Sequence, residues 1–435
     1  MKNIFTFLLS LLTLYSFAQA GHIMQGAGAF NMSMGGAATG QPLDITGALL
    51  WNPAGITEFE NSSMKFDIGM FFSSPKFYSS VPDMQTGTIY SGMTKDDRGV
   101  SPMPAYAYIY KPKNSRHSFG VSAIGISGFG VTFPENNFNP VNANQALGGF
   151  GKIESDYGLF QFGLTWAYAL SDNFSIAVQP NIDWATLELM PNPTANPNQE
   201  FTYPYTNKVN AFGFGAQIAL LYHTDSGFKA GISYKTLQNF KDFEFDNTYP
   251  NGDQSTNSFA MDYPSILSLG LGYSIGQFDL ALDFRHVDYE NTDGFNTTGW
   301  TQTGSVAGFG WDNIQIWSAG VQYKGIDKLP LRLGYTNSSN PISSDVAFFN
   351  IPATAIIKNA FQVGLSYEFS KWFQLDFTYH TASSDGKTSG PVLNPMMIQN
   401  FPPYGAVPNS NVAYEMKTSM IMLGFNFKFD RPEEE

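Results

Sequence analysis

The chain has no cysteine, little charge and no long apolar run in its interior, and each absence excludes a class of protein. Without cysteine there is no disulfide, thiolate metal site or thiol nucleophile. Charged residues make up only 14% of the chain, well below the quarter that is usual in soluble domains. The net charge of −13 argues against nucleic acid as a partner. Beyond the first twenty residues, no stretch of about 18 apolar residues offers a helix that could span a membrane.

Aromatic residues are abundant and alternate with polar ones. They make up 16% of the chain, while the mean hydropathy of −0.16 is ordinary. Between Lys358 and Tyr379, for example, Phe361 and Val363 share one face of a strand, and Gln362 lies on the other. This composition is typical of a transmembrane β-barrel, in which lipid-facing and lumen-facing residues average out. In "IQIWSAGVQY" the alternation changes phase near residues 317–318, which predicts a β-bulge.

Segments of this kind number about fourteen, and most exceed the roughly 9–11 residues that a tilted strand needs to cross a bilayer. The expected strands lie at 63–72, 104–111, 117–126, 156–170, 173–190, 208–223, 227–243, 261–275, 276–290, 311–324, 329–337, 357–369, 371–382 and 412–429. The connections alternate between short and long, as in outer-membrane barrels with tight periplasmic turns and long outer loops. The predicted fold is therefore an all-β, antiparallel transmembrane barrel in the bacterial outer membrane.

The ends of the chain divide it further. A basic start, an apolar run and Ala18-Gln19-Ala20 predict a signal peptide over 1–20. Residues 21–61 are small and apolar without strand alternation, and we expect them to form a plug, or hatch, inside the barrel of residues 62–429. Asp44 can cap a short helix there, and Pro53 would end it. Residues 430–435 read as an acidic periplasmic tail.

Four stretches resemble a known family. They are "GAGAF…MSMGGAATG" after the cleavage site, Asp44-x-Thr46 followed by Asn52-Pro53-Ala54-Gly55, "PSILSLGLGY" at 264–273, and the late "FQVGLSYEFSKWFQLDFTY". Together they resemble the outer-membrane long-chain fatty acid transporters of the FadL type, a group that includes importers of toluene. The likeness covers the whole chain in architecture and is most specific in the expected hatch.

The resemblance implies a transport mechanism without catalysis. Apolar outer loops would capture a hydrophobic ligand, long-chain fatty acids foremost, and a pocket in the barrel would bind it. Movement of the hatch and a kink in the third strand would then open a lateral route through the wall. The implied hatch residues are Asp44, Thr46, Asn52, Pro53, Ala54 and Gly55, and those of the kink are Gly125, Gly128 and Gly130. A plain glycine-rich strand is the alternative for 125–130.

Candidate ligand contacts are of two kinds. Capture residues in the loops would be Phe201, Tyr203, Tyr205, Phe348, Phe349, Met396, Met397 and Phe401. The same side chains could simply fold the loops or sit in the interfacial aromatic girdle. For a fatty acid carboxylate, Arg285 and Arg332 are the lumen-phase candidates, although lumenal acids could equally pair with them. The other expected partners are outer-membrane lipid and lipopolysaccharide, and the family resemblance suggests a monomer.

Other classes of function lack support in the sequence. No nucleophile or metal-binding motif stands out, so we expect no enzyme, no metal and no cofactor. Two alternatives remain open, a general diffusion porin for polar solutes and an adhesin-like structural barrel. An open porin would conduct ions steadily and would not need residues 21–61 as a plug, whereas an adhesin would neither conduct nor bind apolar ligands.

Overall fold

The structure, a computed structural model, describes residues 21–83 and 85–429. The expected signal peptide, 1–20, and the expected acidic tail, 430–435, lie outside the described residues. Within the described residues, the model contains no helix of sufficient length and apolarity to cross a membrane.

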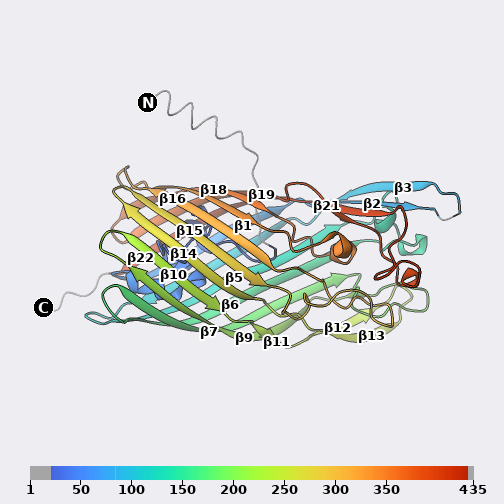
Figure 1. Ribbon diagram of the computed structural model, residues 1–435, viewed down its shortest axis with the longest axis horizontal. Helices are drawn as coiled ribbons and strands as arrows, with labels where there is room; N and C mark the ends of the chain where they lie inside the picture. The colour runs from blue at the N-terminus through green and yellow to red at the C-terminus, as the bar shows by residue number, and fades with distance from the viewer. Residues whose placement is uncertain (1–20, 84, 430–435) are drawn as a thin grey trace, which may run out of the picture.

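One large antiparallel sheet closes on itself (Figure 1). Its strands are β1 (Ser62–Ser73), β4 (Val100–Tyr110), β5 (His117–Phe133), β6 (Ile153–Ala169), β7 (Phe174–Met190), β9 (Val209–His223), β10 (Phe228–Lys235), β11 (Asn239–Phe240), β14 (Ser265–Ile275), β15 (Phe278–Asp288), β16 (Ile314–Tyr323), β17 (Leu331–Ser338), β18 (Asn359–Ser370), β19 (Phe373–Ser383) and β22 (Lys417–Phe429). The first strand pairs with the last, from Ser62 opposite Phe429 onward, and β10 pairs with β9. Since β10 and the short β11 are two parts of one strand, the described chain forms the expected barrel of fourteen strands.

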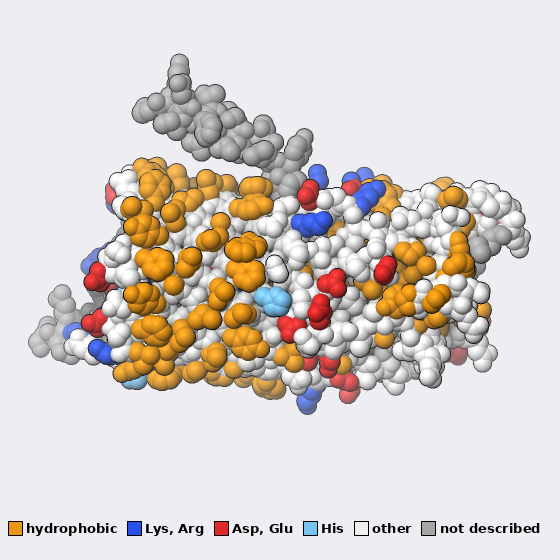
Figure 2. Space-filling model, in the orientation of Figure 1, with side chains coloured by type: hydrophobic (Ala, Val, Ile, Leu, Met, Phe, Trp, Pro, Cys, Tyr) orange, Lys and Arg blue, Asp and Glu red, His pale blue; other side chains and the backbone are white. Residues whose placement is uncertain are grey.

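The two faces of the wall follow the alternation in the sequence. On β1, the side chains of Phe66 and Ile68 are 45% and 39% exposed, whereas Lys65 and Asp67 are fully buried in the lumen. Figure 2 shows that the outward apolar side chains form a belt over the half of the barrel with the short turns, and charged side chains begin where this belt ends. The belt is the surface that a bilayer would cover.

The two ends of the barrel differ, and we assign the end with short turns to the periplasm. At the other end, the long loops contain structure that alternation alone did not predict (Figure 1). Two small sheets stand there, the first of β2 (Lys76–Pro82), β3 (Ile89–Lys95), β20 (Thr388–Gly390) and β21 (Asn411–Glu415), the second of β8 (Tyr205–Thr206), β12 (Phe243–Thr248) and β13 (Gln254–Phe259). Short 3-10 helices complete the loops: η2 (Pro140–Asn142), η3 (Gln145–Leu147), η4 (Ser344–Asn350) and η5 (Pro395–Met397).

Residues 21–61, hereafter the N-terminal segment, lie within the barrel (Figure 1). They form α2 (Gly28–Ser33), α3 (Ile45–Trp51) and the 3-10 helix η1 (Pro53–Glu58). Asp44 caps α3 by accepting a hydrogen bond from the Gly47 N–H at 3.2 Å, and Pro53 begins η1 directly after α3 ends. The small residues let this chain pack closely: a Cβ on Gly40 would lie 2.3 Å from the backbone of Gly270.

Three sequence predictions about the strands need correction. The bulge expected near 317–318 is wrong, because β16 pairs with both neighbours without a register shift. Ile314 and Ile316 face inward, into an upper lumen that is itself apolar, so the chemistry of the inner face changes while the backbone stays regular. The expected strand 412–429 divides into β21 and β22, and the expected strand 227–243 breaks between β10 and β11.

Candidate transport site

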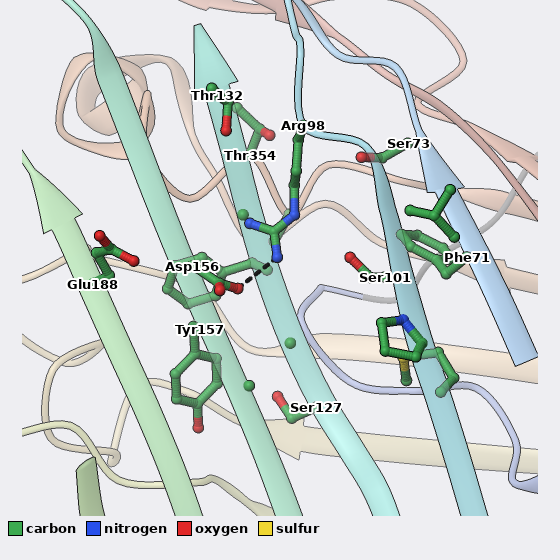
Figure 3. A pocket seen from close by; sticks show the side chains of 18 of the residues that line it. Phe71, Ser73, Arg98, Ser101, Ser127, Thr132, Asp156, Tyr157, Glu188 and Thr354 are labelled. Atoms are coloured by element: carbon green, nitrogen blue, oxygen red, sulfur yellow. Dashed lines mark hydrogen bonds and ion pairs between the residues drawn. The ribbon is translucent and has the colours of Figure 1, made fainter. Parts of the chain in front are cut away.

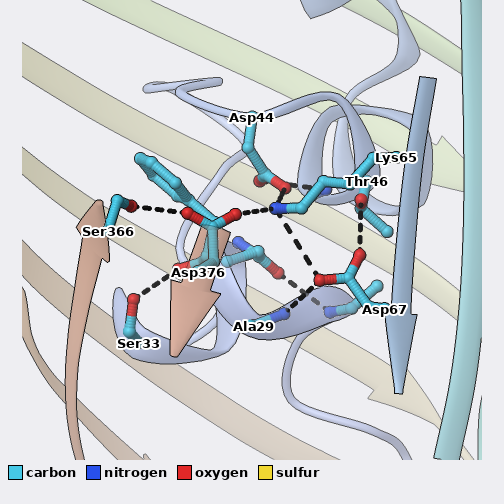
Figure 4. Close-up of polar contacts among 12 residues, drawn as sticks. Ala29, Ser33, Asp44, Thr46, Lys65, Asp67, Ser366 and Asp376 are labelled. Atoms are coloured by element: carbon cyan, nitrogen blue, oxygen red, sulfur yellow. Dashed lines mark hydrogen bonds and ion pairs between the residues drawn. The ribbon is translucent and has the colours of Figure 1, made fainter. Parts of the chain in front are cut away.

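A buried cluster of charges ties the N-terminal segment to the wall near β1 (Figure 4). The Lys65 Nζ lies 2.9 Å from a carboxylate oxygen of Asp44, 2.8 Å from Asp376 and 3.8 Å from Asp67. Asp67 accepts hydrogen bonds from the Ala29 N–H at 2.8 Å and from the Thr46 hydroxyl at 3.3 Å. Buried charges are stable only when they are paired and hydrogen-bonded in this way, so the cluster holds α2 and the start of α3 in one place.

The two arginines that the sequence offered as carboxylate partners also contact the N-terminal segment. Arg332 donates to the Ser33 hydroxyl at 2.6 Å, and its guanidinium stacks 3.9 Å from the centre of the Phe30 ring. Arg285 donates to the Gly36 carbonyl at 2.8 Å and stacks 3.7 Å from the Trp51 ring. Both are buried and engaged, and their pairing with a ligand carboxylate stays a prediction.

The Asn52-Pro53-Ala54-Gly55 stretch fastens the segment at the periplasmic end of the barrel. Asn52 donates from its amide to the carbonyls of Thr39, at 2.7 Å, and Leu220, at 3.0 Å. Its side-chain oxygen accepts from the Ala54 N–H at 3.1 Å. Ala54 packs in an apolar cluster with the wall, and Gly55 lies against Pro42, where a Cβ would come within 2.6 Å.

The wall of the barrel is interrupted between β4 and β5 (Figure 3). The last residue pair of these strands joins Ala105 to Ile124. Further toward the loops, the next connection is the Asp97 N–H, which donates to the Thr132 carbonyl at 2.8 Å. Between these two points lies the stretch that we call the window, where Pro102 and Pro104 cannot donate to a neighbouring strand.

The strand on the other side of the window is irregular. The register of β5 against β6 shifts between Gly125 and Ser127, which leaves Ile126 as an extra residue. Gly125 therefore lies at the shift, with Gly128 and Gly130 just beyond it. Whether these glycines act as a moving kink stays a prediction.

Arg98, which the sequence analysis missed, lies at the window. Its guanidinium donates to the Ser155 carbonyl at 2.7 Å and pairs with Asp156 of β6 at 2.5 Å, across Gly130 (Figure 3). A Cβ on Gly130 would overlap this guanidinium, so glycine is required there. An arginine in a loop carries no pattern in the sequence that would single it out. The two prolines of β4 were the available signal for the interruption.

A cavity of about 430 Å³ adjoins the window, a size that suits a small ligand. It reaches from Arg98 and Asp156 on the wall to Met24 and Tyr157 in the lumen. The start of the N-terminal segment borders it by pairing with the irregular part of β5. There the Met24 N–H donates to the Ile126 carbonyl at 3.0 Å, and the Gly128 N–H donates to the His22 carbonyl at 3.2 Å.

The loop residues predicted to capture ligand fall into two groups. Tyr203, Phe348 and Phe349 are buried and line a small apolar cleft of about 50 Å³ together with Phe150 and Trp300. The remaining predicted residues do not line this cleft: Phe201, Tyr205, Met396, Met397 and Phe401. Of these, Phe201 and Met396 are well exposed, at 66% and 72%. The cleft is a candidate point of entry, and the capture role of all eight side chains stays a prediction.

The described residues contain no group of three or more His, Cys, Asp or Glu side chains that could hold a metal ion. A closed barrel with an outer apolar belt, an enclosed N-terminal segment and a window beside a cavity defines a membrane-barrel transport protein. The comparisons agree with that class: the chain belongs to the family of outer membrane protein transport proteins (OMPP1/FadL/TodX), whose sequence profile matches residues 11–429.

Solved structures of the same fold support this assignment. A FadL homologue of Pseudomonas aeruginosa aligns with a TM-score of 0.73 at 13% identity, covering 94% of this chain and all of that one. The toluene transporter TodX of P. putida gives 0.66 at 15% identity, with 94% and 100% covered. The toluene transporter TbuX of Ralstonia pickettii gives 0.64 at 14%, with 93% and 99% covered. At these identities the likeness concerns the fold, and no curated protein sequence matches the chain.

Proposed function

We propose that the protein takes up hydrophobic small molecules across the outer membrane, passively and under the control of the N-terminal segment acting as a hatch. The observation that carries this proposal is the window between β4 and β5, which opens beside a cavity of about 430 Å³. A porin for polar solutes needs no break in its wall. A ligand bound for the membrane does, because it must leave the lumen sideways.

The route begins at the loops and ends in the lipid. A hydrophobic molecule would enter at the apolar cleft of Tyr203, Phe348 and Phe349, with the more exposed loop side chains helping in capture. It would move down to the cavity and leave through the window as the region of Gly125, Gly128 and Gly130 bends. Such a path avoids exposure to water, which costs about 0.8 kcal/mol per CH₂ group. The barrel would act as a monomer surrounded by lipid and lipopolysaccharide.

Two cargos fit this route. Long-chain fatty acids were the sequence prediction, and the two toluene transporters of the same fold suggest aromatic hydrocarbons. Among the described residues, the buried lumenal cations Lys65, Arg285 and Arg332 are already engaged by acids or by the N-terminal segment. A neutral ligand needs no such cation, so the geometry favours aromatic hydrocarbons. A fatty acid would have to compete for Arg285 or Arg332.

Uptake of labelled toluene and of a labelled long-chain fatty acid, in a strain that lacks its own importer, tests the proposal. The native protein should restore uptake of at least one of them. In Gly128→Trp a bulky side chain occupies the window, since a Cβ there would meet only the Tyr157 carbonyl, at 3.1 Å. We expect uptake to fall to the background of the strain without importer.

The matched control is Ala123→Trp, which places the same side chain on the outer face of β5 below the window, where Ala123 pairs with Tyr106. Its uptake should equal that of the native protein. Steady ion conductance without uptake of either compound would overturn the proposal in favour of a porin. Absence of both would favour an adhesin-like barrel.

A further inference from the structure

The side chain of His22 fills a chamber made of aromatic rings. It is 2% exposed, and six ring centroids lie within 6.5 Å of its own. The rings of this aromatic chamber belong to Phe129, Tyr157, Tyr263, Tyr289, Phe295 and Trp311. They come from β5, β6 and the loops around β14 to β16, so the chain assembles the chamber from distant segments. Its size is therefore that of one planar ring.

Imidazole is a poor occupant for this chamber. Its Nδ1 is 2.7 Å from the Tyr289 hydroxyl, but its Nε2 is buried without a hydrogen-bond partner. The hydroxyl of Tyr263, which faces the same space, is also buried and unpartnered. A buried polar atom without a partner costs free energy, whereas a hydrocarbon ring would keep the ring contacts and leave no such nitrogen.

The chamber is directly connected to the window. Phe129 and Tyr157 line both the aromatic chamber and the 430 Å³ cavity, and Met24 lies in the cavity wall. The backbone of the same residues closes on β5, through the hydrogen bonds of His22 and Met24 described above. The Ser127 hydroxyl adds a further hydrogen bond to the His22 carbonyl, at 3.0 Å. Removing His22 from the chamber would therefore also free the irregular edge of β5.

We propose that the aromatic chamber is the binding site for a neutral single-ring aromatic ligand, and that His22 occupies it as an internal competitor until the ligand displaces it. Displacement lifts residues 21–24 away from β5 and opens the window on the lumenal side. This inference rests on the proposed uptake of hydrophobic molecules and assigns the ring-shaped part of the ligand to a defined place.

Calorimetric titration of the purified, detergent-solubilised protein with toluene tests the site without any transport. In His22→Ala the competitor is gone, and an apolar cavity of ring size takes its place. We expect the dissociation constant for toluene to fall about tenfold or more, as the loss of a competing ring contact predicts. Methylcyclohexane, which has the same size but no π-system, should gain less.

His380→Ala is the matched control, since it removes an equally buried imidazole, 2% exposed, from β19. Its affinity for toluene should equal that of the native protein. An unchanged affinity in His22→Ala would overturn the inference. So would an equal gain for toluene in His380→Ala, because the gain would then not belong to the chamber. Heat-dependent mobility on gels and circular dichroism establish that each variant is a folded barrel.

A reversible cross-link tests the displacement step. Ile23 lies opposite Ser127 as an isolated bridge pair whose flanking residues make the hydrogen bonds, the geometry in which side chains come closest. The chain has no cysteine, so Ile23→Cys/Ser127→Cys creates a single disulfide. We expect toluene uptake to stop when the pair is oxidised and to return on reduction, while each single cysteine variant transports throughout.

The two proposals fail separately. Uptake that persists in the oxidised double variant would overturn the displacement of His22 and leave the uptake function standing. If neither the native nor the reduced protein takes up any hydrophobic compound, the proposed function fails, and the titration still decides whether the chamber binds a ring.

Discussion

The N-terminal segment is attached to the barrel in two different ways. On the side of β1 and β19, Lys65 and three carboxylates form a fully buried cluster around α2 and α3. At the window, residues 22–24 are held on β5 by two backbone hydrogen bonds and one hydroxyl. Breaking a buried ion pair costs about 3–5 kcal/mol, and losing an ordinary hydrogen bond about 0.5–1.5 kcal/mol. The comparison identifies a fixed anchor and a part that can move.

Lys65→Met should have the largest effect on this contrast. It leaves the buried carboxylates of Asp44, Asp67 and Asp376 without their common cation, at a cost of about 3–5 kcal/mol. We expect the whole segment to leave the lumen, so that planar bilayers show steady ion conductance and proteases cleave residues 21–61. Lys324→Met, which removes a half-exposed lysine paired with Asp279, is the control. A closed, protease-resistant Lys65→Met would show that the cluster is not the anchor.

Asn52→Ala should have an intermediate effect. The substitution removes the donor for the buried carbonyls of Thr39 and Leu220, with a cost of about 1–3 kcal/mol. We expect a lower thermal midpoint in detergent and brief openings in conductance records, with the segment still bound through Lys65. Asn61→Ala, at the half-buried end of the segment, should behave like the native protein. Openings as long as those of Lys65→Met would mean that both contacts belong to one anchor.

Ser127→Ala should weaken only the movable part. It removes the hydroxyl that donates to the His22 carbonyl and keeps the backbone bond from Gly128, so the cost is about 0.5–1.5 kcal/mol. The expected result is faster uptake of toluene with no steady conductance. Ser122→Ala, an inward serine of the same strand below the window, serves as the comparison. Uptake that is unchanged or slower would place the controlling contact elsewhere.

The smallest effect concerns the outer sheet of β2 and β21. The Lys76 ammonium beside Glu415 lowers the pKa of that carboxyl, and Tyr78 also donates to it. A lowered folded-state pKa means that the pair stabilises the sheet above the unfolded pKa of about 4.3, and this contribution is lost as pH falls through the folded value. An exposed pair contributes at most about 1 kcal/mol. Hydrogen exchange of β21 should rise at low pH in the native protein. In Glu415→Gln, exchange that still rises by the same amount would exclude this pair as the cause.

The barrel could be predicted from the sequence because its cause is local. Alternation of side chains along each strand places Phe66 and Lys65 on opposite faces whatever the rest of the chain does. The break in pairing at Pro102 and Pro104 depends on which strand lies alongside, and β16 shows that a change in chemistry along one face need not bend the backbone. The bulge expected at 317–318 was wrong for that reason.

The candidate site could be predicted only in part. Asp44 and Asn52 stand in a recognisable local pattern, whereas the partners of Lys65 are separated by up to 311 positions in the sequence, between residues 65 and 376. The aromatic chamber shows the same limit, since His22 meets rings from residues 129 to 311. Such clusters follow from the closure of the barrel and leave no mark in any single stretch.

The pairing of β1 with β22 also governs how the protein can be assembled. This seam joins the first strand of the barrel to the last, and Asp376 on β19 lies just beyond it, next to β22. Lys65 therefore meets Asp376 only once the final strand has arrived. The segment that comes first in the chain must already be inside when the seam closes, so the buried charges make enclosure of that segment and completion of the barrel a single event.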